Sequence, residues 1–163
     1  MLKRITSVAL VHIAAHTNKK TGEIVLAPNP TRESKVPEEK DYMMTMEDVQ
    51  RLHLRARLVV LSSSNTAKGL ITPEGVVGIA RSFLAAGARS VVASIWGVHD
   101  ASTVSLMKCF YKHLEEGKSV SKALFLAINA VRETEKFDLE KYWAPFTLFG
   151  DDVTLDVGEI GKQ

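Results

Sequence analysis

The sequence contains a single cysteine, Cys109, in 163 residues. One cysteine cannot form an intramolecular disulfide, and this usage is typical of a reducing compartment. No stretch approaches the roughly 20 consecutive apolar residues that span a bilayer. The N-terminal MLKRITSVALVHIAAH mixes charges and histidines into its apolar run, unlike a secretory signal. We therefore expect a cytoplasmic protein that does not associate with membranes.

Charge of one sign is not concentrated anywhere along the chain. The 21 basic and 19 acidic residues are interspersed and give a net charge of +2. A nucleic-acid-binding surface gathers basic residues on one face, so we expect no nucleic-acid partner. The nucleotide-binding patterns GxGxxG and GxxxxGK[ST] are missing. His12, His16 and Asp100 have no recognised metal-ligand spacing. We therefore predict neither a cofactor nor a metal.

The residues that are present form buried strands that alternate with amphipathic helices. At 45% hydrophobic, the chain is long enough for one domain with a substantial core. The expected strands are 7–15, 23–27, 58–63, 90–96 and 144–149, and the expected helices are 46–54, 73–86, 102–116 and 119–131. Thr45, Ser119 and either Asp100 or Ser102 are expected helix caps. This alternation predicts an α/β fold with a largely parallel sheet.

Three of the expected strands end in polar residues. These ends carry His16, the triplet Ser62–Ser63–Ser64, and the stretch from Trp96 to Asp100. Open α/β sheets bind ligands outside the carboxyl ends of their strands. His12 and His16 would share one face of an extended strand. Because His12 lies within the apolar run, we expect it to be a hydrogen-bonded core or supporting residue, and His16 to meet solvent and substrate.

Five segments carry a resemblance to a known family. They are VHIAAH, VVLSSSNTAKG, EGVVGIARSFLAAGARSVVASIWGVHDAST, FYKHLEEGKSVSKALFLA and WAPFTLFGD. In this order, from about Leu10 to Asp152, they resemble the CHAT domain, a caspase- and separase-like cysteine-peptidase fold of clan CD. The resemblance implies a caspase-like α/β fold, with a mostly parallel sheet flanked by helices, that lacks the family's first strands. It also implies a peptidase-fold core over 1–152, a tail over 153–163, and tetratricopeptide repeats N-terminal to the domain in a full-length protein.

The same resemblance implies roles for individual residues. His16 stands at the catalytic-histidine position and Ser64 at the nucleophilic-cysteine position. The backbone N–H groups of Thr17 and Ser64 would bind the oxyanion. Trp96 and Asp100 would line the specificity pocket, with Asp100 facing a basic substrate side chain. An Asp that precedes Ala-Ser-Thr can equally be a helix N-cap, and the two roles are compatible.

Two positions depart from the family pattern. Thr17 replaces a glycine, and a threonine adopts positive φ only at a steric cost. Ser64 replaces the cysteine, and a serine hydroxyl is much harder to deprotonate than a thiol of pKa about 8.5. Cys109 lies within an expected helix, where a lone cysteine is usually a small packing residue. It is therefore no substitute for the missing nucleophile.

Three classes of function follow from these departures. The first is a catalytically inactive CHAT-type domain that binds a protein or peptide as an interaction or regulatory module. The second is an active endopeptidase with a preference for basic residues. It would work either through Ser64 itself or as a Cys/His enzyme whose cysteine has been replaced by serine in this chain. The third is a non-proteolytic ligand-binding α/β domain that uses the same strand-end crevice.

Overall fold

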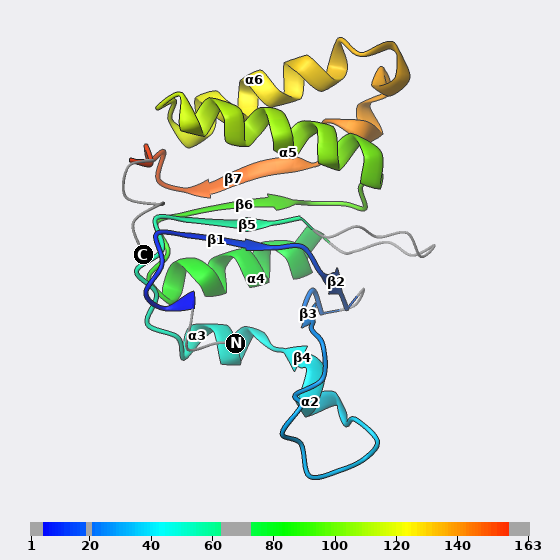
Figure 1. Ribbon diagram of the computed structural model, residues 1–163, viewed down its shortest axis with the longest axis vertical. Coiled ribbons are helices and arrows are strands. Elements are labelled where there is room, and N and C mark those ends of the chain that lie inside the picture. Colours follow the sequence, from blue (N-terminus) through cyan, green and yellow to red (C-terminus); the bar gives the residue numbers. More distant parts are fainter. Residues whose placement is uncertain (1–4, 19–20, 63–72, 157–163) are drawn as a thin grey trace.

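A four-stranded, mostly parallel sheet forms the centre of the fold, and the candidate site lies at the edge where three of its strands end. The computed structural model describes residues 5–18, 21–62 and 73–156. The sheet has the order β1-β5-β6-β7 (Figure 1). Its strands are β1 (Leu10–Ile13), β5 (Leu58–Leu61), β6 (Ser90–Ser94) and β7 (Phe146–Gly150). β1, β5 and β6 pair in parallel and β7 pairs antiparallel to β6, so the carboxyl ends of the first three strands lie at one edge.

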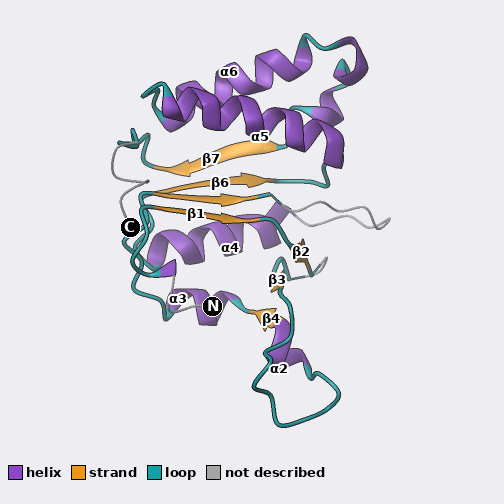
Figure 2. Ribbon diagram, viewed as in Figure 1, coloured by secondary structure: helices purple, strands orange, loops and turns teal. Residues whose placement is uncertain are grey.

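Helices cover both faces of this sheet, as Figure 2 shows. The helices are α3 (Met46–Gln50) and α4 (Pro73–Ala85) on one face, and α5 (Asp100–Glu115) and α6 (Val120–Arg132) on the other. Two short 3-10 helices, Glu135–Phe137 and Glu140–Tyr142, lead from α6 to β7. The segments LVVL of β5 and SVVAS of β6 are buried throughout, because a sheet covered on both faces has no solvent-facing side.

Each face of the sheet has its own hydrophobic cluster. Phe83 of α4 is fully buried in one cluster and Phe110 of α5 in the other. Because side chains alternate along a strand, β1 contributes Val11 and Ile13 to the α4 cluster, whereas Leu10 packs against the α5 cluster. His12 has the same parity as Leu10 and therefore lies on the α5 face.

A second, three-stranded antiparallel sheet follows β1. It has the order β2-β3-β4 and consists of β2 (His16–Thr17), β3 (Ile24–Val25) and β4 (Met43–Met44), with α2 (Glu39–Tyr42) directly before β4. The expectation of one strand over 7–15 ending at His16 is therefore corrected: β1 ends at Ile13, and His16 begins β2. His16 pairs with Val25 across this second sheet.

The expected helix caps are confirmed at two of three places. The hydroxyl of Thr45 accepts from the backbone N–H of Asp48, and that of Ser119 accepts from Lys122. For α5 the expected cap, Asp100 or Ser102, is wrong, because His99 is the N-cap residue. The Ser102 hydroxyl instead donates to the His99 carbonyl oxygen at 2.9 Å.

The first residues after the expected boundary at residue 152 pack against the main body. Val153 and Leu155 are 4% and 3% exposed and belong to the cluster under α5 and α6. The backbone N–H of Val120 donates to the Val153 carbonyl oxygen at 2.8 Å.

The sequence-based expectation of a mixed α/β fold with a mostly parallel sheet flanked by helices is confirmed.

Candidate functional site

A cavity opens where β1 and β5 end, next to the first turns of α5. Its volume is about 360 Å³, and its lining residues are His12, Ala14, Ala15, His16, Ser62, Asp100, Thr103, Val104 and Met107. Both histidines, one serine and Asp100 thus face the same space, although they come from four different parts of the chain. The alanines, Val104 and Met107 give the cavity an apolar wall.

His12 holds the centre of this group through both ring nitrogens. Its Nε2 lies 2.6 Å from Ser62 Oγ, and its Nδ1 lies 2.9 Å from the Tyr111 hydroxyl oxygen. The expected hydrogen-bonded supporting role of His12 agrees with these contacts. The residue is not part of the core, however, because it stays exposed and lines the cavity.

Partial desolvation by the surrounding side chains shifts the pKa values of His12 and Tyr111. Desolvation lowers the pKa of His12 below its ordinary value and raises the pKa of Tyr111 to about 12. The charged form of each group is disfavoured where water is displaced. Near neutral pH the imidazole and the phenol are therefore both uncharged.

Tyr111 is a site residue that the sequence did not predict, whereas Ser62 belongs to the serine triplet predicted at a strand end. Ser62 lies just beyond β5 and is 7% exposed, and its backbone N–H donates to the Ile13 carbonyl oxygen at 3.1 Å. The alternation of side chains along β5 indicates that Ser62 shares a face with His12. His12 is opposite Val60 in the parallel ladder, and Ser62 lies two residues further along the same face. Tyr111 gave no such signal, because it comes from a helix that only the tertiary fold brings next to β1.

His16 and Asp100 reach the cavity from elements other than the ends of β1 and β6. His16 is the exposed first residue of β2, and Asp100 is the exposed first residue of α5. Asp100 has no hydrogen-bond or ion-pair partner among the described residues. Since it does not cap α5, its carboxylate remains open to a ligand that enters the cavity.

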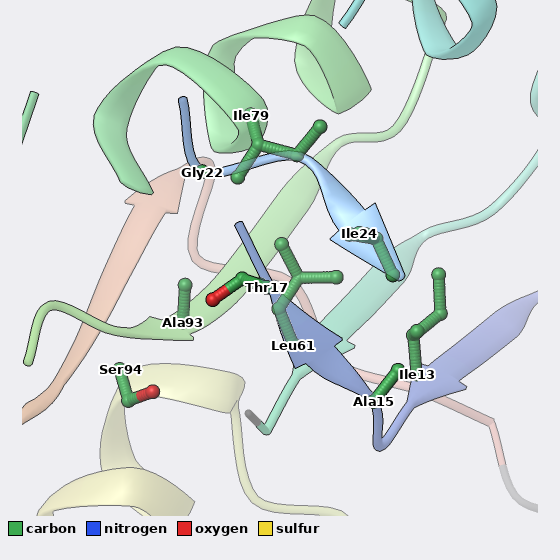
Figure 3. Close-up of a pocket in the computed structure, with 9 residues that line it drawn as sticks. All are labelled: Ile13, Ala15, Thr17, Gly22, Ile24, Leu61, Ile79, Ala93 and Ser94. Atoms are coloured by element: carbon green, nitrogen blue, oxygen red, sulfur yellow. The ribbon is translucent and has the colours of Figure 1, made fainter. Parts of the chain in front are cut away.

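Thr17 faces a different space from its neighbour His16. It lines a second cavity of only about 20 Å³ together with Ile13, Ile24, Leu61 and Ile79 (Figure 3). The Thr17 hydroxyl is buried and has no hydrogen-bond partner among the described residues. A space of this size holds about one water molecule, so it does not accommodate a substrate side chain.

The backbone of Thr17 carries no left-handed strain. It pairs with Ile24 in the antiparallel β2–β3 ladder, and no non-glycine residue in the described part of the chain has a positive φ. The steric cost expected from replacing a glycine at this position is therefore not incurred in this conformation.

The remaining predicted site residues lie outside the cavity or outside the described residues. Trp96 is 40% exposed between β6 and α5 and is not among the residues that line the cavity. Ser64 lies outside the described residues. Cys109 is a half-buried free thiol on α5 that packs against the cluster around Phe110.

The described residues show neither a cluster of metal-binding side chains nor a membrane-spanning helix. No group of three or more His, Cys, Asp or Glu side chains is placed to hold a metal ion in this part of the chain. Among the same residues, no helix is long and apolar enough to cross a bilayer.

Comparisons with known proteins show which family the chain belongs to. The model of the CHAT domain family matches residues 1–151. The chain is 31% identical to tetratricopeptide repeat protein 28 of Mus musculus and 31% identical to that of Homo sapiens, in each case over 96% of this chain. It spans only 8% of the length of either relative. With a family match over nearly its whole length and a fold of the kind that this family implies, the chain belongs to the CHAT domain family.

Proposed function

We propose that this CHAT domain is an interaction or regulatory module that binds a protein or peptide segment at the strand-end cavity and does not cleave it. The observation that carries the proposal is the shared cavity of His16 and Asp100 at the carboxyl edge of the sheet. That edge is where α/β folds bind ligands. The full-length relatives are named for tetratricopeptide repeats, which supports a larger protein with such repeats N-terminal to the domain.

The proposed lack of endopeptidase activity follows from the residue at position 64. In the Cys–His dyad of the family, imidazole generates or stabilises a thiolate. Ser64 offers a hydroxyl, which needs a base that a third group orients. His16 is exposed at the start of β2. In this proposal His16 keeps its place while Ser64 cannot be activated for amide cleavage.

The ligand that best fits the cavity is a peptide with a basic side chain. The carboxylate of Asp100 faces the cavity without a described partner, and Arg or Lys would give it a charge-assisted hydrogen bond. Val104 and Met107 beside it would pack along the aliphatic stem of such a side chain. In this proposal the backbone N–H groups of Thr17 and Ser64 would bind a carbonyl oxygen of the peptide, and Trp96, which lies outside the cavity lining, would contact the peptide beyond it.

The variant Ser64→Cys tests whether the dyad geometry is retained. It is made in a Cys109→Ala background, which leaves one thiol, and Cys109→Ala alone is the matched control. If His16 lowers the pKa of the new thiol toward neutrality, alkylation by iodoacetamide at pH 7 should be about tenfold faster than for a free thiol of pKa about 8.5. Adding His16→Ala should remove this acceleration.

The Ser64→Cys variant also distinguishes two hypotheses: an inactive binding module, and an endopeptidase whose cysteine has been replaced by serine. Turnover of Arg- or Lys-containing peptides by Ser64→Cys, with binding but no cleavage by the Ser64 protein, would mean that only the nucleophile is missing. An alkylation rate that His16→Ala leaves unchanged would contradict the dyad. Peptide cleavage by the Ser64 protein itself would contradict the proposed lack of endopeptidase activity.

A further inference from the structure

A serine hydroxyl, an imidazole and a phenol form a continuous hydrogen-bonded chain at the cavity. Ser62 Oγ, His12 Nε2, His12 Nδ1 and the Tyr111 oxygen are linked by contacts of 2.6 and 2.9 Å. The three side chains come from the end of β5, from β1 and from α5. The imidazole thus has a hydroxyl on one side and a group that fixes its ring on the other.

This arrangement contains the elements of hydroxyl activation. A neutral imidazole has one N–H donor and one acceptor nitrogen. In the tautomer in which Nδ1–H donates to the Tyr111 oxygen, Nε2 is the acceptor and faces the Ser62 O–H. A nucleophile within hydrogen-bond reach of a base, with a third group that orients the base, is the general pattern of nucleophilic catalysis.

Ser62 is nearly buried, yet it lines the cavity. The backbone around it is fixed by the Ser62 N–H to Ile13 carbonyl bond of 3.1 Å. The residue is 7% exposed but lines the cavity, opposite an apolar wall that includes Val104 and Met107. A small acyl group with a short aliphatic chain fits a space of about 360 Å³ with this lining.

We propose that Ser62 is an acyl-accepting nucleophile with His12 as its general base and Tyr111 as a positioning residue, and that its substrates are esters of short aliphatic acids. This activity goes beyond the proposed peptide binding, because it uses Ser62 rather than position 64 and breaks an ester rather than a peptide bond.

The reaction balances with the groups present and water. Ser62 Oγ attacks the ester carbonyl carbon while its proton passes to His12 Nε2. The C–O bond to the leaving group breaks, and the leaving oxygen takes that proton to depart as an alcohol or phenol. Water then attacks the acyl–Ser62 ester while its proton passes to His12 Nε2. The bond between the acyl carbon and Ser62 Oγ breaks, and His12 returns the proton to Oγ. The products are the carboxylic acid and free Ser62, and no oxidant or reductant takes part.

The third group explains the restriction to esters. Tyr111 is a neutral phenol at working pH, since burial raises its pKa to about 12. Unlike a carboxylate, it does not offset the positive charge that develops on the imidazole during attack. The hydrogen-bonded chain of Ser62, His12 and Tyr111 is therefore suited to cleaving esters with a good leaving group and not amides.

The test uses p-nitrophenyl butyrate with the unaltered protein. We expect a burst of p-nitrophenol and a butyryl adduct on Ser62, found by fragmenting the tryptic peptide 58–68, which also separates Ser62 from its neighbouring serines. His12→Gln should lower the acylation rate about 100-fold, the lower end of the usual general-base contribution. Ser105→Ala, which changes an exposed serine on α5, is the matched control and should react like the unaltered protein.

Tyr111→Phe distinguishes positioning from packing, since the ring and its volume remain. It should lower the acylation rate and change its pH profile, whereas a packing role would leave both unchanged. An adduct on a serine other than Ser62, or no adduct at all, would overturn the proposal. So would a rate that His12→Gln does not alter in a protein whose circular dichroism shows it to be folded. Because peptide binding is measured separately, none of these results decides the proposed function.

Discussion

At the scale of single residues, the behaviour of the cavity depends on which groups are charged near neutral pH. His12 is neutral because desolvation lowers its pKa. Both of its nitrogens face protein hydroxyls, although the residue as a whole stays exposed. Asp100 carries its carboxylate at the cavity wall without a described partner. The cavity therefore combines a neutral imidazole with an acidic side chain that has no described partner.

The lowered pKa of His12 is directly measurable by NMR titration of its imidazole resonances. We expect a midpoint below that of an ordinary histidine. Tyr111→Phe should leave the midpoint low, because desolvation and not the phenol hydrogen bond is the cause. A midpoint at or above the ordinary value would mean that His12 is substantially protonated near neutral pH, and it would contradict its assignment as a base.

The same shift determines how His12 affects stability. Its folded-state pKa is below its unfolded-state pKa, so between the two values the unfolded chain binds more protons. Stability then rises with pH across this window and falls as pH drops from the unfolded pKa toward the folded one. Urea unfolding of the unaltered protein and of His12→Gln across this range should show a shallower pH dependence in the variant.

The sequence predicted that His16, Asp100 and the serines after the second buried strand lie at one edge of the sheet, but it did not predict the contact between His12 and Tyr111. Polar residues that follow apolar strands are visible in the sequence, and both His16 and Asp100 do line the cavity. The contact between His12 and Tyr111 joins residues 99 apart in the chain. No local periodicity encodes such a contact, since it depends on how α5 lies over the sheet.

At the scale of elements, the turn between α4 and β6 sets where β6 begins. Gly87 has φ +112°, and a Cβ added there would lie 2.5 Å from the Leu54 carbonyl oxygen. The Leu54 N–H also donates to the Ala86 carbonyl oxygen at 2.7 Å, so the two segments cannot move apart without losing this bond. Glycine is thus required both for its conformation and for its lack of a side chain.

Gly87→Ala should therefore lower the free energy of unfolding by clearly more than the roughly 1–2 kcal/mol of a left-handed non-glycine residue. Gly117→Ala is the matched control, since Gly117 has φ +76° but nothing within 4 Å of an added Cβ. The free energy of unfolding of Gly117→Ala should fall only by the roughly 1–2 kcal/mol cost of the left-handed backbone. Urea denaturation compares the two, and equal losses would contradict the role of the close approach to Leu54.

Elements long enough to show a periodicity were predictable, and the shortest ones were not. The pattern of apolar residues located β5, β6, α5 and α6 to within a few residues. The two-residue strand β2 is defined by its pairing with β3 and not by its own composition. The sequence therefore gave no signal for the break between Ile13 and His16, which moves His16 into the second sheet.

At the scale of the whole molecule, the strand-end cavity lies at the carboxyl edge of the central sheet, where residues of β1, β2 and α5 line it. β1, β5 and β6 end at this edge, and the second sheet and the first turn of α5 lie beside it (Figure 1). The hydrophobic cluster that contains residues of α5 and α6 extends along the chain as far as Leu155. Met107 belongs to the cluster on the α5 face and also lines the cavity, so a ligand there would contact the edge of that cluster.

Peptide binding to the unaltered protein, measured by fluorescence anisotropy, tests the recognition role of this edge most directly. Two labelled peptides that differ only by Arg against Asp at one position are compared in the unaltered protein, in Asp100→Asn and in Asp138→Asn, an exposed control outside the cavity lining. Because Asp100 is exposed, an ion pair there is worth up to about 1 kcal/mol. We predict a preference for Arg of roughly fivefold that weakens with salt, disappears in Asp100→Asn and persists in Asp138→Asn. Equal binding of both peptides, or a preference that Asp100→Asn retains, would contradict recognition of a basic side chain at this cavity.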